Sequence, residues 1–243
     1  MKMFVRSVQV FTCSVLTVSA QTGRLVVPNQ YSNTLANTSD NAPLGAVNQH
    51  FQQDYSGSSL ISNGLTPGET ITAIGFRVAA GESSIPAQTV SDYSIQMGLG
   101  VSPGSMSLTF ANNGSAMTLV RSGALDITAG QFAGGAGVNP FGMIQLSSPY
   151  TYTGGDLLID VSYSGFSNGR DANVEYPYDS SLGQTAFGSG PTSTTADKGL
   201  FNEAIVFAFD VLPQSVPEPT TMGFLGWGAL GVFLLQRNRK RRS

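Results

Sequence analysis

Two segments of this chain alternate apolar and polar residues one by one, and this pattern constrains the fold more than any other feature of the sequence. A repeat of two places successive side chains on opposite faces of an extended chain, whereas an amphipathic helix repeats every 3.6 residues. Both segments are therefore predicted to be β-strands with one buried face. The apolar members are Tyr93, Ile95, Met97 and Leu99 in residues 92–99, and Leu157, Ile159, Val161 and Tyr163 in residues 156–163.

Weaker strand patterns lie on either side of these two, separated by turn-forming Gly, Pro and Asn. The strands are predicted at residues 70–78, 117–121, 142–147 and 203–211, and the last is apolar on both faces, as is typical of a central strand. Residues 129–139 and 178–198 are rich in small and polar residues and are predicted to be loops. Many short strands joined by such turns favour an all-β fold, a single antiparallel β-sandwich of jelly-roll-like type over residues 21–212.

The first 20 residues have the order of a secretory signal peptide, which would form a signal helix. Lys2 and Arg6 precede a mildly apolar run, and Val18 and Ala20 place small residues at the −3 and −1 positions of a cleavage site. We expect cleavage between Ala20 and Gln21; the alternative is a first strand of the domain. Cys13 lies in the removed segment, so the mature chain would hold no cysteine.

The charge balance changes once the two ends are set aside. Residues 21–215 carry 5 basic and 14 acidic residues, a balance of −9, against −3 for the whole chain. Such a surface repels nucleic acid and anionic lipid headgroups. We therefore expect no nucleic-acid partner. The acidic surface could bind divalent cations or basic partners, or it could serve only to keep the domain soluble.

The C-terminal end has three parts in a fixed order. Residues 213–219 form a linker that contains Val216, Pro217, Glu218 and Pro219, and an apolar run follows at residues 220–236. Sixteen apolar or small residues, Thr220 to Leu235, span about 24 Å as a helix, a little under a hydrocarbon core of about 30 Å. A short transmembrane helix is predicted there, with residues 237–243 as a cytoplasmic tail. Its basic cluster is Arg237, Arg239, Lys240, Arg241 and Arg242.

This order of motif, short apolar helix and Arg-rich end resembles the PEP-CTERM sorting signal of bacteria. The resemblance implies exosortase as a partner, a transpeptidase-like membrane protease that recognises and removes the tail. Val216, Pro217, Glu218 and Pro219 would then be recognition residues, and the prolines would keep them extended. The protein would sit on the outer face of the inner membrane and later at the cell surface or outside the cell. The alternative is a single-span anchor that is never cut.

A second, weaker resemblance covers three short segments. Residues 50–55, 71–77 and 156–161 are similar to a recurrent ectodomain of other PEP-CTERM proteins. That family has no established activity, so the resemblance implies one β domain and no chemistry.

Candidate catalytic residues are few. Gly165–Gly169 matches the G-x-S-x-G nucleophile pattern, but no His follows Ser167, and the single His50 is upstream. Asp156 and Asp160 lie about 13 Å apart on one strand, too far for a glycosidase pair. A pair between strands, such as Asp92 with Asp160, stays open. We predict no catalytic residue.

A run of oxygen-bearing side chains offers the one candidate cofactor site, for calcium. It consists of Asp171, Asn173, Glu175 and Asp179. Calcium prefers such ligands, but Tyr176 stands where an EF-hand loop requires Gly. A looser calcium site or a solvated loop remains.

Together these patterns predict a non-enzymatic, exported surface or matrix protein. Its expected partners are signal peptidase and exosortase, the membrane through the C-terminal helix, and exopolysaccharide. The alternative is a carbohydrate-binding module in which exposed rings stack on sugars. The candidate rings, which could equally be packed in the interior, are Tyr150, Tyr152, Tyr176 and Tyr178. A hydrolase would need a cleft with paired carboxylates.

Overall fold

The computed structural model describes residues 22–40, 42–45, 48–169 and 171–214. The strands of the described chain are β1 (Gly23–Val27), β2 (Thr38–Asp40), β3 (Gln49–Tyr55), β4 (Thr70–Arg77), β5 (Gln88–Gly100), β6 (Gly114–Arg121), β7 (Leu125–Ile127), β8 (Phe141–Thr151), β9 (Leu157–Phe166), β10 (Val174–Tyr176), β11 (Gly183–Gly188), β12 (Gly199–Phe201) and β13 (Phe207–Leu212). The helices are α1 (Gly57–Ser62) and the single-turn η1 (Asn29–Tyr31), η2 (Pro103–Ser105) and η3 (Phe110–Asn112).

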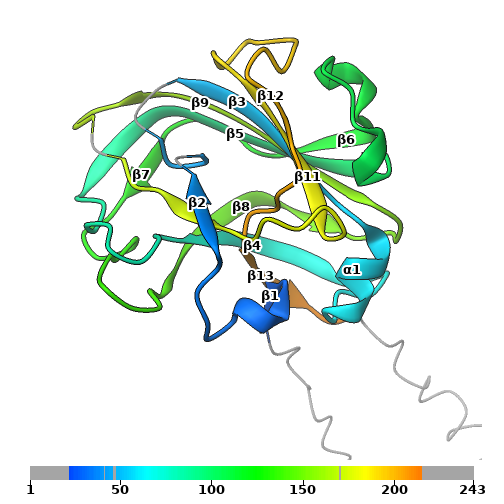
Figure 1. The fold of residues 1–243 in the computed structure, drawn as a ribbon, viewed down its shortest axis with the longest axis horizontal. Coiled ribbons are helices and arrows are strands. Elements are labelled where there is room, and N and C mark those ends of the chain that lie inside the picture. The colour runs from blue at the N-terminus through cyan, green and yellow to red at the C-terminus, as the bar shows by residue number, and fades with distance from the viewer. Residues whose placement is uncertain (1–21, 41, 46–47, 170, 215–243) are drawn as a thin grey trace, which may run out of the picture.

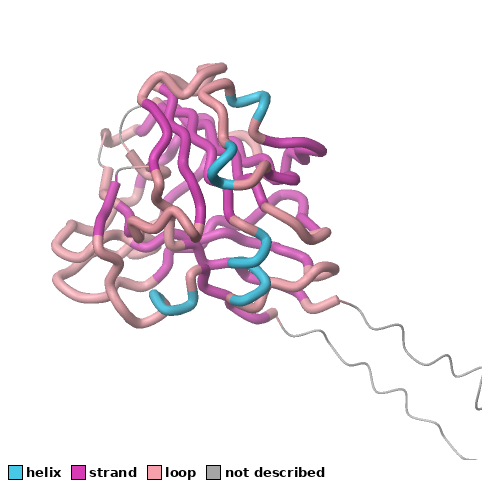
Figure 2. The backbone as a smooth tube through the Cα atoms, turned by 45° about the vertical axis from the view of Figure 1, so that its right-hand side comes forward, coloured by secondary structure: helices cyan, strands magenta, loops and turns pink. Residues whose placement is uncertain are grey.

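The strands form two main antiparallel sheets, which lie one above the other (Figure 1). A four-stranded sheet has the order β1-β13-β4-β8, and a seven-stranded sheet has the order β12-β11-β3-β9-β5-β6 with β7 beside β5. Strands β2 and β10 pair separately. Loops and short helices join the strands, as Figure 2 shows. The prediction of an all-β chain with antiparallel sheets is confirmed, and neither sheet closes on itself.

The main hydrophobic core lies between the two sheets. Phe207 of the four-stranded sheet contacts Tyr55 of the seven-stranded sheet, with ring centroids 5.8 Å apart, and also Phe76 at 4.9 Å. Within the larger sheet, Tyr93 stacks on Tyr163 at 5.6 Å. All five rings are fully buried. Burying aromatic surface of this kind is a main source of stability for a domain with little charge.

The two clearest strand predictions are confirmed in position. Residues 92–99 lie in β5 and residues 156–163 overlap β9. Their apolar faces are buried, except that Leu99 is 38% exposed at the end of β5. Leu158, on the opposite face of β9, is also buried, because the segment from Val101 to Asn113 covers the outer face of the sheet there.

Two predictions about the C-terminal half were wrong. The strand expected at 203–211 begins only at Phe207, and residues 203–206 are a buried connection without strand structure. The segment 178–198, expected to be a loop, contains β11, which pairs with β3 over its whole length. Residues 129–139 are irregular, as predicted.

The two ends of the described chain lie together. Strand β1 pairs with β13, so that Gly23 is opposite Val211, and β13 is held between β1 and β4. No helix among the described residues is long and apolar enough to cross a membrane. The predicted signal segment 1–20 and the predicted transmembrane helix 220–236 lie outside the described residues.

Candidate functional site

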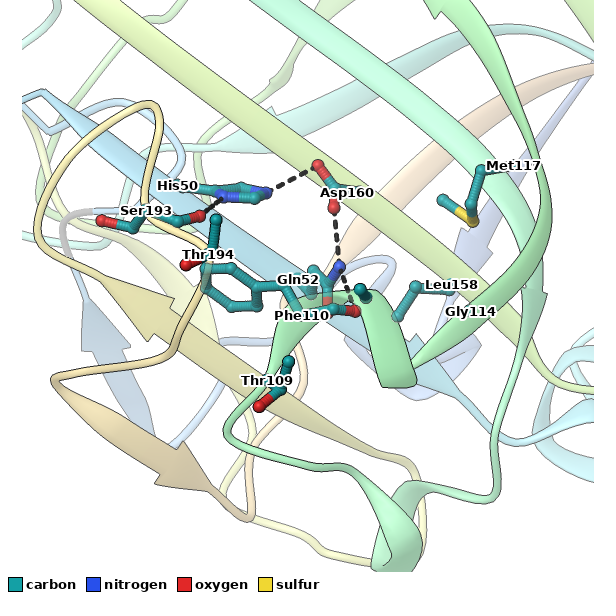
Figure 3. Close-up of a pocket in the computed structure, with 11 residues that line it drawn as sticks. His50, Gln52, Thr109, Phe110, Gly114, Met117, Leu158, Asp160, Ser193 and Thr194 are labelled. Carbon is teal, nitrogen blue, oxygen red and sulfur yellow. Dashed lines mark hydrogen bonds and ion pairs between the residues drawn. The ribbon is translucent and has the colours of Figure 1, made fainter.

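A pocket of about 310 Å³ lies on the outer face of the seven-stranded sheet, the face turned away from the core (Figure 3). Strands β3 and β9 form its floor, and the segments around η3 and around Ser193 form its walls. The lining residues are His50, Gln52, Thr109, Phe110, Ala111, Gly114, Met117, Leu158, Asp160, Ser193 and Thr194.

Alternation along β3 brings His50 and Gln52 to this face. Phe51 points into the core, so its two neighbours point outward. His50 Nε2 lies 2.9 Å from Asp160 Oδ1, and His50 Nδ1 lies 2.7 Å from the carbonyl oxygen of Ser193. A carbonyl and a carboxylate both accept hydrogen bonds, so this geometry suits an imidazolium that donates from both ring nitrogens.

The second oxygen of Asp160 is also held. Gln52 Nε2 donates to Asp160 Oδ2 at 2.6 Å and to the carbonyl of Phe110 at 3.2 Å. Gln52 Oε1 accepts from Asn113 Nδ2 at 2.9 Å. Asn113 is fully buried and bonds the backbone of Ser107 on both sides. The network therefore fixes the wall of the pocket to its floor.

The charge pair sets the protonation of His50. Burial lowers the pKa of His50, but the hydrogen bond and charge of Asp160 and the Ser193 carbonyl raise it, and the net pKa is above 6.5. The side chains of His50 and Asp160 are only 14% and 13% exposed. With both ring nitrogens engaged, His50 in this arrangement neither activates a nucleophile nor ligates a metal. The pocket therefore combines apolar lining residues, Phe110, Met117 and Leu158, with the His50–Asp160 ion pair.

Replacing Asp160 by asparagine is expected to bring the pKa of His50 below 6.5, because burial then acts without the opposing charge. The raised pKa of the folded form means that the pair stabilises the protein below pH 6.5, and that this stabilisation is lost as the pH rises through the folded pKa. His50 is the only histidine, so an NMR titration of its ring signals measures the effect directly. Asp92→Asn is the matched control and should leave the pKa of His50 unchanged; an unchanged pKa in Asp160→Asn would contradict this account.

The other candidate catalytic residues lie apart from one another. The register places Asp92 opposite Ser164 and Asp160 opposite Gln96, so Asp92 and Asp160 are four residues, or about 13 Å, apart along the sheet. Ser167 closes a turn, since its N–H donates to the carbonyl of Thr89 and its Oγ accepts from the N–H of Thr89, both at 3.0 Å.

Three of the four calcium candidates are engaged elsewhere. Glu175 accepts from Arg77 Nε at 2.8 Å, and both side chains are buried. Asn173 donates to Glu82 at 2.8 Å, and Asp179 accepts from the N–H of Ser181 at 2.9 Å. In the part of the chain that the structure describes, no three His, Cys, Asp or Glu side chains gather as a metal site. Calcium binding at Asp171, Asn173, Glu175 and Asp179 stays a prediction.

Three of the four tyrosines considered for sugar stacking are packed in the interior instead, which counts against a carbohydrate platform made of them. Tyr150, Tyr152 and Tyr176 are 8%, 1% and 0% exposed, and only Tyr178, at 65%, is open to solvent. Two of the buried hydroxyls bond backbone carbonyls, from Tyr152 to Gly155 at 2.6 Å and from Tyr176 to Ala42 at 3.1 Å. These three rings are therefore buried packing residues.

Sequence reasoning set His50 aside as an isolated residue. One signal was present, since His50, Gln52 and Asp54 are the outward positions of a strand whose inward positions are Phe51, Gln53 and Tyr55. Three polar residues at alternate positions of one strand indicate a polar outer face. The partner of His50, Asp160, lies 110 residues further along the chain, so the sequence alone does not connect the two.

Residues 215–240 match the family model of the PEP-CTERM protein-sorting motif, which confirms the resemblance. The motif implies an exported protein that exosortase processes and that is sorted to the cell envelope. No curated protein matches the chain, and no solved structure does. The sorting residues Val216–Pro219, the cleavage site Ala20–Gln21 and the basic cluster Arg237–Arg242 lie outside the described residues.

Proposed function

We propose that this protein is a non-enzymatic component of the cell surface or extracellular matrix. The observation that carries the proposal is the sorting motif at residues 215–240. Signal peptidase cuts between Ala20 and Gln21, and the helix at 220–236 with the basic cluster after it holds the chain at the outer face of the inner membrane. Exosortase then cuts near Val216–Pro219, and the jelly-roll-like β-sandwich is delivered to the surface or the matrix.

The described part of the chain supports a binding or structural role over catalysis. Both nitrogens of the only histidine are occupied by Asp160 and Ser193, and Asp92 and Asp160 are too far apart for a glycosidase pair. The acidic balance of −9 over residues 21–215 suits a soluble, low-charge domain in the matrix. Three of the four rings considered for sugar stacking are buried, which counts against a carbohydrate-binding surface made of them. The pocket at His50 is then the place at which binding of exopolysaccharide is to be tested.

The experiment that tests the proposal is an intact-mass measurement on protein from the native cells, with both termini sequenced. The expected chain starts at Gln21 and ends within the Val216–Pro219 region. The triple variant Pro217→Ala/Glu218→Gln/Pro219→Ala should retain the Arg-rich end, while the control Pro213→Ala should be processed normally. A wild-type chain that keeps Arg237–Arg242 would overturn the sorting step.

A further inference from the structure

The pocket at His50 continues into a polar strip on the outer face of the seven-stranded sheet. In the register, Gln96 of β5 is opposite Asp160 of β9, and Ser94 is opposite Ser162. Residues opposite each other in an antiparallel pair share a face, so these side chains lie on the face that carries Asp160. The polar strip, defined as Ser94, Gln96 and Ser162, therefore adjoins the floor of the pocket.

The polar strip and the pocket walls present side chains that a ligand can bond. Ser94, Gln96 and Ser162 are half-buried, and their side chains make no hydrogen bond to any residue that the structure describes. Thr109 and Thr194, one on each wall, are exposed, and their hydroxyls likewise have no partner in the described part of the chain. Hydroxyls and amides both donate and accept hydrogen bonds.

Asp160 lines the pocket and keeps acceptor capacity. An ionised carboxylate offers about four acceptor positions. Among the described residues, His50 Nε2 takes one position at 2.9 Å and Gln52 Nε2 takes another at 2.6 Å (Figure 3). The remaining positions can accept from two neighbouring hydroxyls of one ligand. The side chain of Asp160 is 13% exposed, so a ligand in the pocket can reach it.

The pocket walls are held in place by the protein itself. The N–H of Phe110 donates to the carbonyl of Thr194 at 3.1 Å, and the N–H of Ala196 donates to the carbonyl of Leu108 at 2.7 Å. These bonds join the two walls, and a preformed pocket loses little conformational entropy on binding. The volume of about 310 Å³ lies at the lower end of the range of ligand pockets, about 300–1,000 Å³. It suits a single sugar ring.

We propose that the pocket and the polar strip bind an uncharged polysaccharide, with one sugar ring inside the pocket. A sugar ring has apolar C–H groups on its faces and hydroxyls around its edge. Phe110, Met117 and Leu158 supply the apolar contact, and Asp160 accepts from the hydroxyls. The polar strip bonds the next part of the polymer. The inference deepens the proposed matrix role and rests on it.

The charge of the surface selects an uncharged polymer. The imidazolium of His50 compensates the charge of Asp160 inside the pocket. Residues 21–215 carry a balance of −9, which repels an acidic polymer. A purely apolar ligand would cover Asp160 and the polar strip without replacing their bonds to water, which costs free energy. A chain of neutral sugars meets both conditions.

The test is affinity electrophoresis of the full chain, in a detergent without a sugar headgroup, through gels that contain one polysaccharide each. The uncharged probes are dextran, mannan and the uncharged fraction of the polysaccharide from the native cells, and alginate is the acidic comparison. We expect at least one uncharged polymer to retard the protein and alginate not to retard it. Retardation by alginate alone, or by none of the polymers, would overturn the proposal.

Two variants locate the binding, and both are measured with the polymer that retards the wild type. Gln96→Ala removes a side chain without a described partner, so the Tm should stay the same while the Kd rises about 3–10-fold. Asp160→Asn removes a charged acceptor, so the Kd should rise at least about tenfold. Gln145→Ala, which changes an exposed glutamine on β8 of the other sheet, is the matched control and should bind like the wild type.

Intact-mass measurement on the same variants from the native cells separates this inference from the proposed function. All variants should be processed at both ends like the wild type, because the pocket lies outside the sorting motif at residues 215–240. If processing is normal but the Kd is unchanged in either Gln96→Ala or Asp160→Asn, the binding site is overturned while the sorted matrix protein stands.

Discussion

Arg77→Met is expected to destabilise the protein by about 3–5 kcal/mol, because it leaves a buried carboxylate without its cation. Arg77 and Glu175 are 0% and 3% exposed. Arg77 also donates to the carbonyl of Thr34 and lies 5.2 Å from the ring centre of Phe141, while Glu175 accepts from the N–H of Ala36 at 3.0 Å. The pair thus joins β4, β10 and the segment before β2, and all three should loosen together.

Urea denaturation measures this effect, and two further variants make it specific. Arg24→Met breaks an ion pair with Asp210 whose arginine is 49% exposed, and it should cost less than about 1 kcal/mol. The double variant Arg77→Met/Glu175→Met should recover most of the loss, since the uncompensated charge is then gone. If Arg77→Met and Arg24→Met cost the same, the buried pair is not what holds these segments.

Gln53→Met is expected to cost about 2–4 kcal/mol, because the removal of one amide leaves buried backbone groups unbonded. Gln53 is 0% exposed and faces the core. Its oxygen accepts from the N–H of Ile205 at 2.9 Å and from the hydroxyl of Thr185 at 2.8 Å. Its nitrogen donates to the carbonyl of Gln184 at 3.2 Å. One side chain thereby secures the strandless connection 203–206 to the seven-stranded sheet.

The matched control for this variant is Gln145→Met, which changes an exposed glutamine on β8. It should leave the free energy of unfolding within about 0.5 kcal/mol of the wild type. Amide hydrogen exchange supplies a second readout, since the Ile205 N–H should exchange much faster in Gln53→Met. Unchanged exchange at Ile205 would mean that the connection is held by other contacts.

The fold could be predicted where one face of a strand is buried and the other is polar. Tyr93, Ile95 and Met97 carry such a pattern, and so do the inward residues of β9. Strand β11 could not be predicted, because Ala186 and Phe187 are buried on opposite faces and no alternation is left. The start of β13 was misplaced for a related reason. Residues 203–206 are buried, but hydrogen bonds to Gln53, to Thr185 and to the backbone of Glu175 and Pro177 hold them in place of regular strand pairing.

The pocket at His50 could not be predicted from the sequence, because its residues come together only through the register of neighbouring strands. His50 and Asp160 lie on neighbouring strands, and a slip of one residue would turn Asp160 into the core. The sequence also does not distinguish buried from exposed tyrosines. A ring such as Tyr176 suits a buried position as well as an exposed one when its hydroxyl can donate to a nearby carbonyl.

The position of β13 has a mechanical consequence. A pull on the chain at Gln214 runs along β13, which is bonded to β1 on one side and to β4 on the other. Hydrogen bonds between antiparallel strands lie across the strand direction, so such tension loads both rows in shear at once instead of opening them one after another. Tension applied at the C-terminal end is therefore expected to break both rows of hydrogen bonds together. The seven-stranded sheet, whose outer face carries His50, lies above the sheet that bears this load (Figure 1).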